Sequence, residues 1–326
     1  MNEDKLKNNS SIQKNTLSIF QIAVMTTICV ASLRTLPPMA EEGKASILMY
    51  IIPAILFLIP TSLVSAEFAT TYKGGIYVWI REAFGNRMGF VAIWLQWIQN
   101  VVWYPVQLAF VAAALAFTIN RGDLSNSGLF TAVVIIVVYW FSTFLAFKGG
   151  NLFAKVSSIG GMIGVLIPGA ILIILGLLWM AQGQPISESY LQSSYIPKIT
   201  GISSLVLIVS NVLSYAGMEM NAVHAGQMEN PKKDFTKAIA LAFILILCVF
   251  VFPTLAIAIA IPADKLGMAN GIMVAFQEFF EKLNISWMSN VMSGAMFFGA
   301  ISSVVTWVAG PSKGLLDAGR TGLLPP

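Results

Sequence analysis

Long apolar runs, separated by short polar segments, follow one another along almost the whole chain. A bilayer span needs about 20 mainly apolar residues, and eight stretches satisfy that rule: residues 17–38, 46–70, 88–119, 128–147, 153–181, 203–225, 236–261 and 286–310. Composition agrees, because 57% of the residues are hydrophobic and only 10% are charged, against about 25% charged residues in soluble domains. The sequence therefore predicts an all-α, polytopic membrane protein with one transmembrane domain over 17–326.

Residues 1–16 are polar, and apolar sequence begins at Leu17. Because the first apolar stretch is followed by a tandem proline and then by further spans, we interpret it as a retained helix and not as a cleaved leader. With the N-terminus inside, thirteen Lys and Arg residues fall on the inner side and five on the outer side, as the positive-inside rule requires. We expect an integral protein of the bacterial plasma membrane with a cytoplasmic N-terminal tail.

The net charge of +4 comes from basic residues in short loops between apolar runs. They are topology signals rather than a phosphate-binding face, so no nucleic-acid partner is expected. Cys29 and Cys248 lie inside apolar runs, and His224 is the single histidine. We therefore expect no disulfide framework, no metal site and no cofactor. The chain has no Walker motif and no clustered catalytic groups, which argues against ATP-driven transport and against an enzyme.

Residues 264–285, between the last two spans, place apolar residues at helical spacing among charged ones. Such a pattern predicts a short amphipathic helix on the outer membrane surface, with an ordinary loop as the alternative.

Arg34 stands within the first span, where a charge is costly. We expect the tandem prolines Pro37 and Pro38 to end the helix locally, and the small residues Ala31 and Ser32 to allow a broken backbone. Irregular backbone is tolerated at membrane depth only where it is buried in protein or lines a cavity. This segment is therefore predicted to form half of a substrate site. Arg34 itself either lines that site or extends to the outer interface.

Glu219 is the second costly charge, and it stands two residues after Gly217 in the sixth apolar run. A glycine beside an ionisable residue at mid-membrane indicates a second helix break. A buried glutamate here carries a proton, pairs with a cation, or is a structural residue bonded to neighbouring helices.

Two further ionisable residues lie near span ends. Glu67 is expected to have a structural role, in which it pairs with Lys73, with Arg81 or with the inner ends of neighbouring helices. His224 closes the sixth run, where a histidine caps a helix or senses pH.

Breaks in the first and sixth spans, five spans apart, are typical of inverted-repeat transporters, which bind substrate between discontinuous helices. Four motifs have a familiar form: KGGIYVW at 73–79, SYAGME at 214–219, MENPKKD at 228–234 and GPSKGL at 310–315. With them, the chain from Leu17 onward resembles the amino acid–polyamine–organocation superfamily, and within it the glutamate/GABA antiporter group.

This resemblance implies a LeuT-type fold in which helices one to five and six to ten form inverted repeats. It implies secondary active transport by alternating access, as amino acid/amine exchange of the glutamate/GABA type or as proton-coupled uptake. The expected partners are an amino acid or amine, the lipid bilayer and protons. The substrate-binding residues that it implies are Val30, Ala31, Ser32, Leu33, Arg34, Tyr215, Ala216, Gly217 and Glu219, with Glu219 and His224 as proton-coupling or pH-sensing candidates.

The chain departs from the superfamily pattern in two ways. Members often have a Gly-Ser-Gly type of break in helix one, whereas this chain has Val30, Ala31 and Ser32, with Arg34 beyond. Eight spans also leave the second repeat with three of its five helices. The alternative reading is therefore a truncated, transport-inactive fragment of such a permease. A channel is disfavoured, because polar residues concentrate at two breaks instead of forming faces along several helices.

Overall fold

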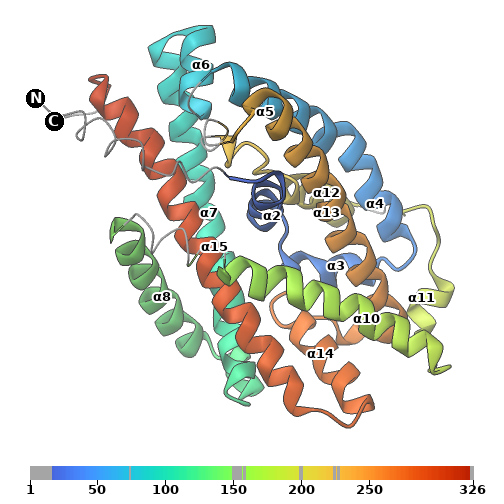
Figure 1. Cartoon of the computed structure of the whole chain (residues 1–326). Coiled ribbons are helices and arrows are strands. Elements are labelled where there is room, and N and C mark those ends of the chain that lie inside the picture. The colour runs from blue at the N-terminus through green and yellow to red at the C-terminus, as the bar shows by residue number, and fades with distance from the viewer. Residues whose placement is uncertain are drawn as a thin grey trace, which may run out of the picture.

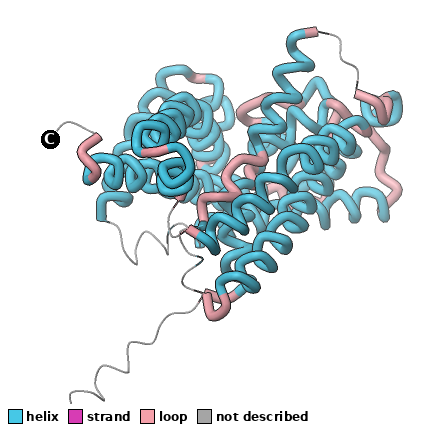
Figure 2. The backbone as a smooth tube through the Cα atoms, turned by 90° about the horizontal axis from the view of Figure 1, so that it is seen from above, coloured by secondary structure: helices cyan, strands magenta, loops and turns pink. Residues whose placement is uncertain are grey.

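The computed structural model describes residues 17–72, 75–148, 156, 159–197, 201–222, 225 and 228–323. These ranges are helical and contain no strand (Figures 1 and 2). The α-helices are α2 (Ile19–Val30), α3 (Leu36–Glu41), α4 (Ala45–Pro53), α5 (Ile59–Thr71), α6 (Ile76–Phe84), α7 (Asn86–Thr118), α8 (Gly128–Lys148), α10 (Ile167–Ala181), α11 (Glu188–Gln192), α12 (Ile202–Ser214), α13 (Pro231–Ala260), α14 (Gly271–Lys282) and α15 (Trp287–Arg320). Short 3-10 helices cover Leu33–Thr35, Gly122–Asn126 and Ala263–Lys265, and π-helical segments cover Ala54–Leu58, joining α4 to α5, and Met162–Leu166, preceding α10.

Within the described ranges, six helices are long and apolar enough to cross a membrane. The pair α2 and α3, bent by 44° at the break between them, makes a seventh span if it is counted as one. The sixth predicted span, 203–225, is helical only at its start. Its helix α12 has 13 residues and ends at Ser214, about 20 Å of helix where a bilayer core needs about 30 Å. Turns follow it, because Gly217 takes a φ of +117° that no α-helix accepts.

The first helix starts where its sequence supplies a cap. The Ser18 hydroxyl accepts a hydrogen bond from the Gln21 amide at 3.2 Å, and the Gln21 side chain accepts one from the Ser18 amide at 2.9 Å. This reciprocal pair satisfies two amide donors that the first turn would leave free.

The prediction that Pro37 and Pro38 end the first helix is wrong. Helix α2 ends at Val30, and Ala31 and Ser32 have extended backbones. The prolines instead lie in the first turn of α3. Proline is tolerated there, because first-turn amides have no partner within the helix.

The longest helices form the scaffold around the break. Helix α7 packs along α15, with α6 and α8 against the pair, while α13 packs against α2, α5 and α10. Figure 1 shows α2 near the middle of the molecule, between α15 and α13. The π-helical segment before α10 crosses α15 at Gly164 and Gly299, where the two backbones touch: a Cβ placed on Gly164 would lie 2.3 Å from the Cα of Gly299.

The amphipathic segment is a helix, α14, but its apolar face does not lie on the membrane surface as predicted. Phe276, Phe279 and Phe280 are buried in the protein core. Phe279 meets the ring of Trp179 on α10 edge-on, at 5.6 Å between centroids. The apolar face is covered by protein because α14 folds back over α3, α10 and α15.

Candidate functional site

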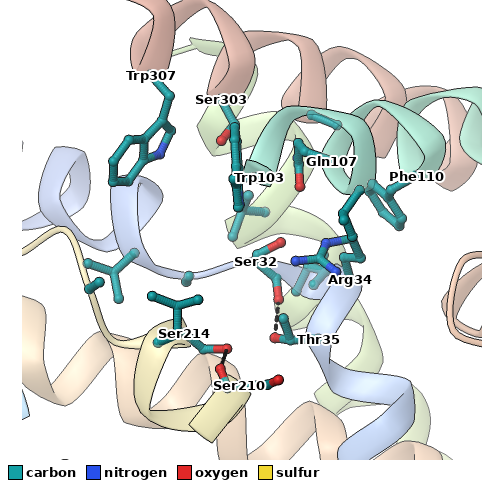
Figure 3. Close-up of a pocket in the computed structure, with 18 of the residues that line it drawn as sticks. Ser32, Arg34, Thr35, Trp103, Gln107, Phe110, Ser210, Ser214, Ser303 and Trp307 are labelled. Carbon is teal, nitrogen blue, oxygen red and sulfur yellow. Dashed lines mark hydrogen bonds between the residues drawn. The ribbon is translucent and has the colours of Figure 1, made fainter. Parts of the chain in front are cut away.

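A cavity of about 880 Å³ lies where the broken first helix meets α7, α12, α15 and the segment before α10 (Figure 3). Its walls are largely apolar. The polar side chains that line it include Ser32, Arg34, Thr35, Asn100, Gln107, Ser210, Ser214 and Ser303.

The first break supplies one wall of the cavity, formed by residues 28–35. They include five of the predicted site residues: Val30, Ala31, Ser32, Leu33 and Arg34. The side chain of Thr35 donates to the carbonyl of Ser32 at 2.8 Å, which holds the short 3-10 turn.

Arg34 extends into this cavity, and among the described lining residues it is the one that carries a charge. Its Nε atom is fully buried and has no hydrogen-bond partner in the described part of the chain. Arg34 and Glu219 are not paired with each other. The sequence allowed Arg34 either to line a site at the break or to extend to the outer interface, and in the structure its side chain lines the cavity.

The second break contributes less of the wall than predicted. Ala216 lines the cavity, whereas Tyr215, Gly217 and Glu219 are not among its lining residues. Glu219 is half-buried in the turns after α12.

Tyr215 is fully buried and faces away from the cavity wall. Its hydroxyl donates to the backbone carbonyl of Tyr50 at 3.0 Å, while the Tyr50 hydroxyl is 3.1 Å from the Thr254 hydroxyl. One turn earlier, the Asn211 side chain donates to the carbonyl of Met49. These bonds fix the end of α12 to α4 and α13, so the structure gives Tyr215 an anchoring role.

The two breaks nevertheless meet. A Cβ placed on Gly217 would lie 3.5 Å from both the Cys29 carbonyl oxygen and the Val30 side chain. The Asn221 side chain donates to the Thr26 hydroxyl at 3.2 Å and to the Cys29 sulfur at 3.6 Å. The 3.5 Å approaches to Gly217 are ordinary contact distances, so it is the positive φ of Gly217 that favours glycine at this position.

Sequence reasoning missed the contribution of α7 and α15 to the cavity. Trp103 and Trp307 line it with ring centroids 5.7 Å apart, and the Tyr104 hydroxyl donates to the Trp307 carbonyl at 3.1 Å. Gln107 lines it as well and is only 3% exposed. The signal for Gln107 in the sequence is an amide side chain within an apolar run.

Two other predicted residues lie elsewhere. Glu67 is exposed on α5, and Arg81 pairs with its neighbour Glu82 at 2.8 Å instead of with Glu67. Lys73, the alternative partner, and His224, the pH-sensing candidate, lie outside the described residues. The described part of the chain holds no cluster of three or more metal-ligating side chains.

The sequence profile of the family described as amino acid permease matches residues 15–326. The chain belongs to the amino acid permease family. It is 41% identical to an uncharacterized transporter of Legionella pneumophila over 314 residues, which are 96% of this chain and 67% of that protein. It is 30% identical to the glutamate/gamma-aminobutyrate antiporter of Lactococcus lactis, over 95% of this chain and 62% of that protein.

A probable agmatine/putrescine antiporter of Lactococcus lactis is 26% identical, over 96% of this chain and 66% of that protein. The chain thus spans about two thirds of the length of these relatives. Membership in the family, with several apolar helices of spanning length, makes it an integral membrane protein of a transporter family.

Proposed function

We propose that this permease binds an amino acid in the cavity between its two helix breaks and moves it by alternating access, as exchange or as proton-coupled uptake. The observation that carries the proposal is the position of the cavity. Residues of both breaks line it, at the point where Gly217 approaches the end of α2. Discontinuous helices that meet at one cavity are the usual setting of substrate sites in inverted-repeat transporters. A LeuT-type arrangement in the plasma membrane, with the N-terminus cytoplasmic, belongs to this proposal.

The charge of the cavity favours one class of substrate over another. One relative is named a glutamate/gamma-aminobutyrate antiporter, and another is named a probable agmatine/putrescine antiporter. Arg34 is the one charged side chain among the described lining residues, and no acidic side chain accompanies it there. A guanidinium repels a diamine dication and holds a carboxylate. We therefore propose a substrate that bears a carboxylate, such as glutamate or gamma-aminobutyrate.

The two ends of the break hold the two ends of such a substrate. The last carbonyls of α2 lack partners within the helix and lie at its negative dipole end, which suits the substrate ammonium group. Beyond the break, α3 has six residues, and its Pro37 and Pro38 carry no amide hydrogen. Backbone amides are therefore scarce on that side, and Arg34 supplies the donors for the carboxylate.

The test is binding and exchange by the purified chain in proteoliposomes. Radiolabelled glutamate should bind, and unlabelled glutamate or gamma-aminobutyrate should displace it at lower concentration than putrescine does. Loading the vesicles with unlabelled glutamate should then accelerate entry of the label. Binding without exchange would favour the transport-inactive alternative. Absence of binding, in protein that is folded by circular dichroism, would reject the proposal.

A further inference from the structure

Two residues that line the cavity each have a buried polar atom without a hydrogen-bond partner, one a donor and the other an acceptor. The Nε–H donor of Arg34 and the Oε1 acceptor of Gln107 are both fully buried, and neither has a hydrogen-bond partner in the described part of the chain. Figure 3 shows the Gln107 amide oxygen, which projects from α7, directed toward the guanidinium of Arg34 on the break.

A buried polar atom without a hydrogen-bond partner destabilises a protein, and native structures rarely contain one without a reason. Here one atom can donate, the other can accept, and both belong to residues of the same cavity. A small side-chain rotation that brought them together would satisfy both at once.

We propose that Gln107 positions Arg34 for the substrate: its amide oxygen accepts a hydrogen bond from Arg34 Nε–H when a carboxylate occupies the cavity. This inference rests on the proposed function. With Nε held by the protein, the two terminal guanidinium nitrogens present a fixed fork to the carboxylate. A fork of this kind holds a carboxylate bidentately, which a freely rotating guanidinium does less well. Gln107 thereby helps to set the charge selectivity of the site without touching the substrate.

Gln107→Met tests the positioning role, because it keeps the length of the side chain and removes the acceptor. Radiolabelled glutamate binding to the purified chain should weaken by about tenfold, the equivalent of one hydrogen bond to a charged group. The matched control is Gln96→Met on the same helix, since Gln96 is half-buried and does not line the cavity. It should leave glutamate affinity within about twofold of wild type.

Gln107→Glu tests the preference of the site between glutamate and putrescine, which should not change if Gln107 has only a structural role. The introduced carboxylate pairs with Arg34 and occupies its fork. Glutamate affinity should fall by well over tenfold, and putrescine should become the better competitor. Unchanged selectivity in a variant that remains folded would overturn the proposal.

A double-mutant cycle decides whether Gln107 acts through Arg34. Arg34→Ala should abolish most of the preference for glutamate, and adding Gln107→Met should weaken binding no further. If the two losses add, Gln107 acts independently, and the proposal is wrong even though the cavity still binds glutamate. If the wild-type chain binds no amino acid, the proposed function itself fails, an outcome distinct from an additive cycle.

Discussion

The hydroxyl of Tyr215 donates a hydrogen bond to the backbone carbonyl of Tyr50, 3.0 Å away, and so joins the second helix break to α4. Tyr215→Phe removes only this donor from a fully buried side chain. We expect stability to fall by about 1 kcal/mol, because the Tyr50 carbonyl loses a partner. Glutamate affinity should change by less than about twofold, because the ring packs behind the cavity wall.

Thermal unfolding and equilibrium binding on the same preparation check both parts. Tyr195→Phe is the control, since that side chain is 62% exposed. A variant that kept its unfolding temperature but lost glutamate binding would give Tyr215 the substrate-contacting role that the family resemblance implies.

The crossing of α15 over the segment before α10 should tolerate no added methyl group. Gly164→Ala would place its Cβ 2.3 Å from the Cα of Gly299, so the backbones must separate. Destabilisation of about 1–3 kcal/mol is expected, seen as a lower unfolding temperature. Gly169→Ala is the matched control, because its Cβ would meet Leu33 and Val249 at ordinary contact distances of 3.6 and 3.7 Å. Equal unfolding temperatures for the two variants would show that the crossing adapts.

Glu219 should be needed for proton coupling more than for folding. It is half-buried beside the second break, and Glu219→Gln keeps its shape while removing the titratable charge. Glutamate uptake measured across a range of external pH should become nearly independent of pH. Glu67→Gln removes an exposed carboxyl from α5 and should leave the pH profile as in wild type. A wild-type profile in the Glu219 variant would make that residue structural.

Lys44, in the turn between α3 and α4, contacts residues 190–193, in the segment between α10 and α12. Its ammonium donates to the Leu191 carbonyl at 3.0 Å and lies 5.5 Å from the ring centroid of Tyr190, while its backbone amide donates to the Ser193 hydroxyl. Lys44→Met keeps the stem and removes the charge. Amide hydrogen exchange over residues 187–196 should become about two- to fivefold faster, whereas Lys282→Met on α14 should leave it unchanged. Equal exchange rates over residues 187–196 in the two variants would show that the Lys44 ammonium does not stabilise this segment.

The broken first helix could be anticipated from the sequence, because its cause is local. Ala31 and Ser32 follow a long apolar run and precede two prolines, and few backbones accommodate that order without leaving the helix. The role of Pro37 and Pro38 could not be predicted in the same way, since the same proline geometry suits either the end of one helix or the first turn of the next. Only the position of α3 in the fold distinguishes the two.

The remainder of the cavity could not be anticipated, because it depends on which helices lie together. Gln107 is one of four amide side chains in the 88–119 run, and nothing near it in sequence indicates Arg34. The apolar face of α14 likewise suited the membrane surface as well as a protein neighbour. Only the packing of α14 against Trp179 decides between them. Tyr215 shows the same limit, since the family motif names it but not the direction of its side chain.

The most direct test of the account asks whether substrate occupies the cavity at the first break. Ser32 lines the cavity and is half-buried, so Ser32→Cys, with Cys29→Ala and Cys248→Ser removing the native thiols, places one reactive sulfur there. The rate of its modification by a small methanethiosulfonate reagent is measured with and without glutamate. The same measurement on Ser127→Cys, which is half-buried like position 32 but lies before α8 and outside the cavity, serves as the reference. The account predicts that glutamate slows modification at position 32 in a saturable manner, at concentrations that match its binding constant, and leaves position 127 unaffected. Full reactivity at position 32 when glutamate saturates the protein would contradict it.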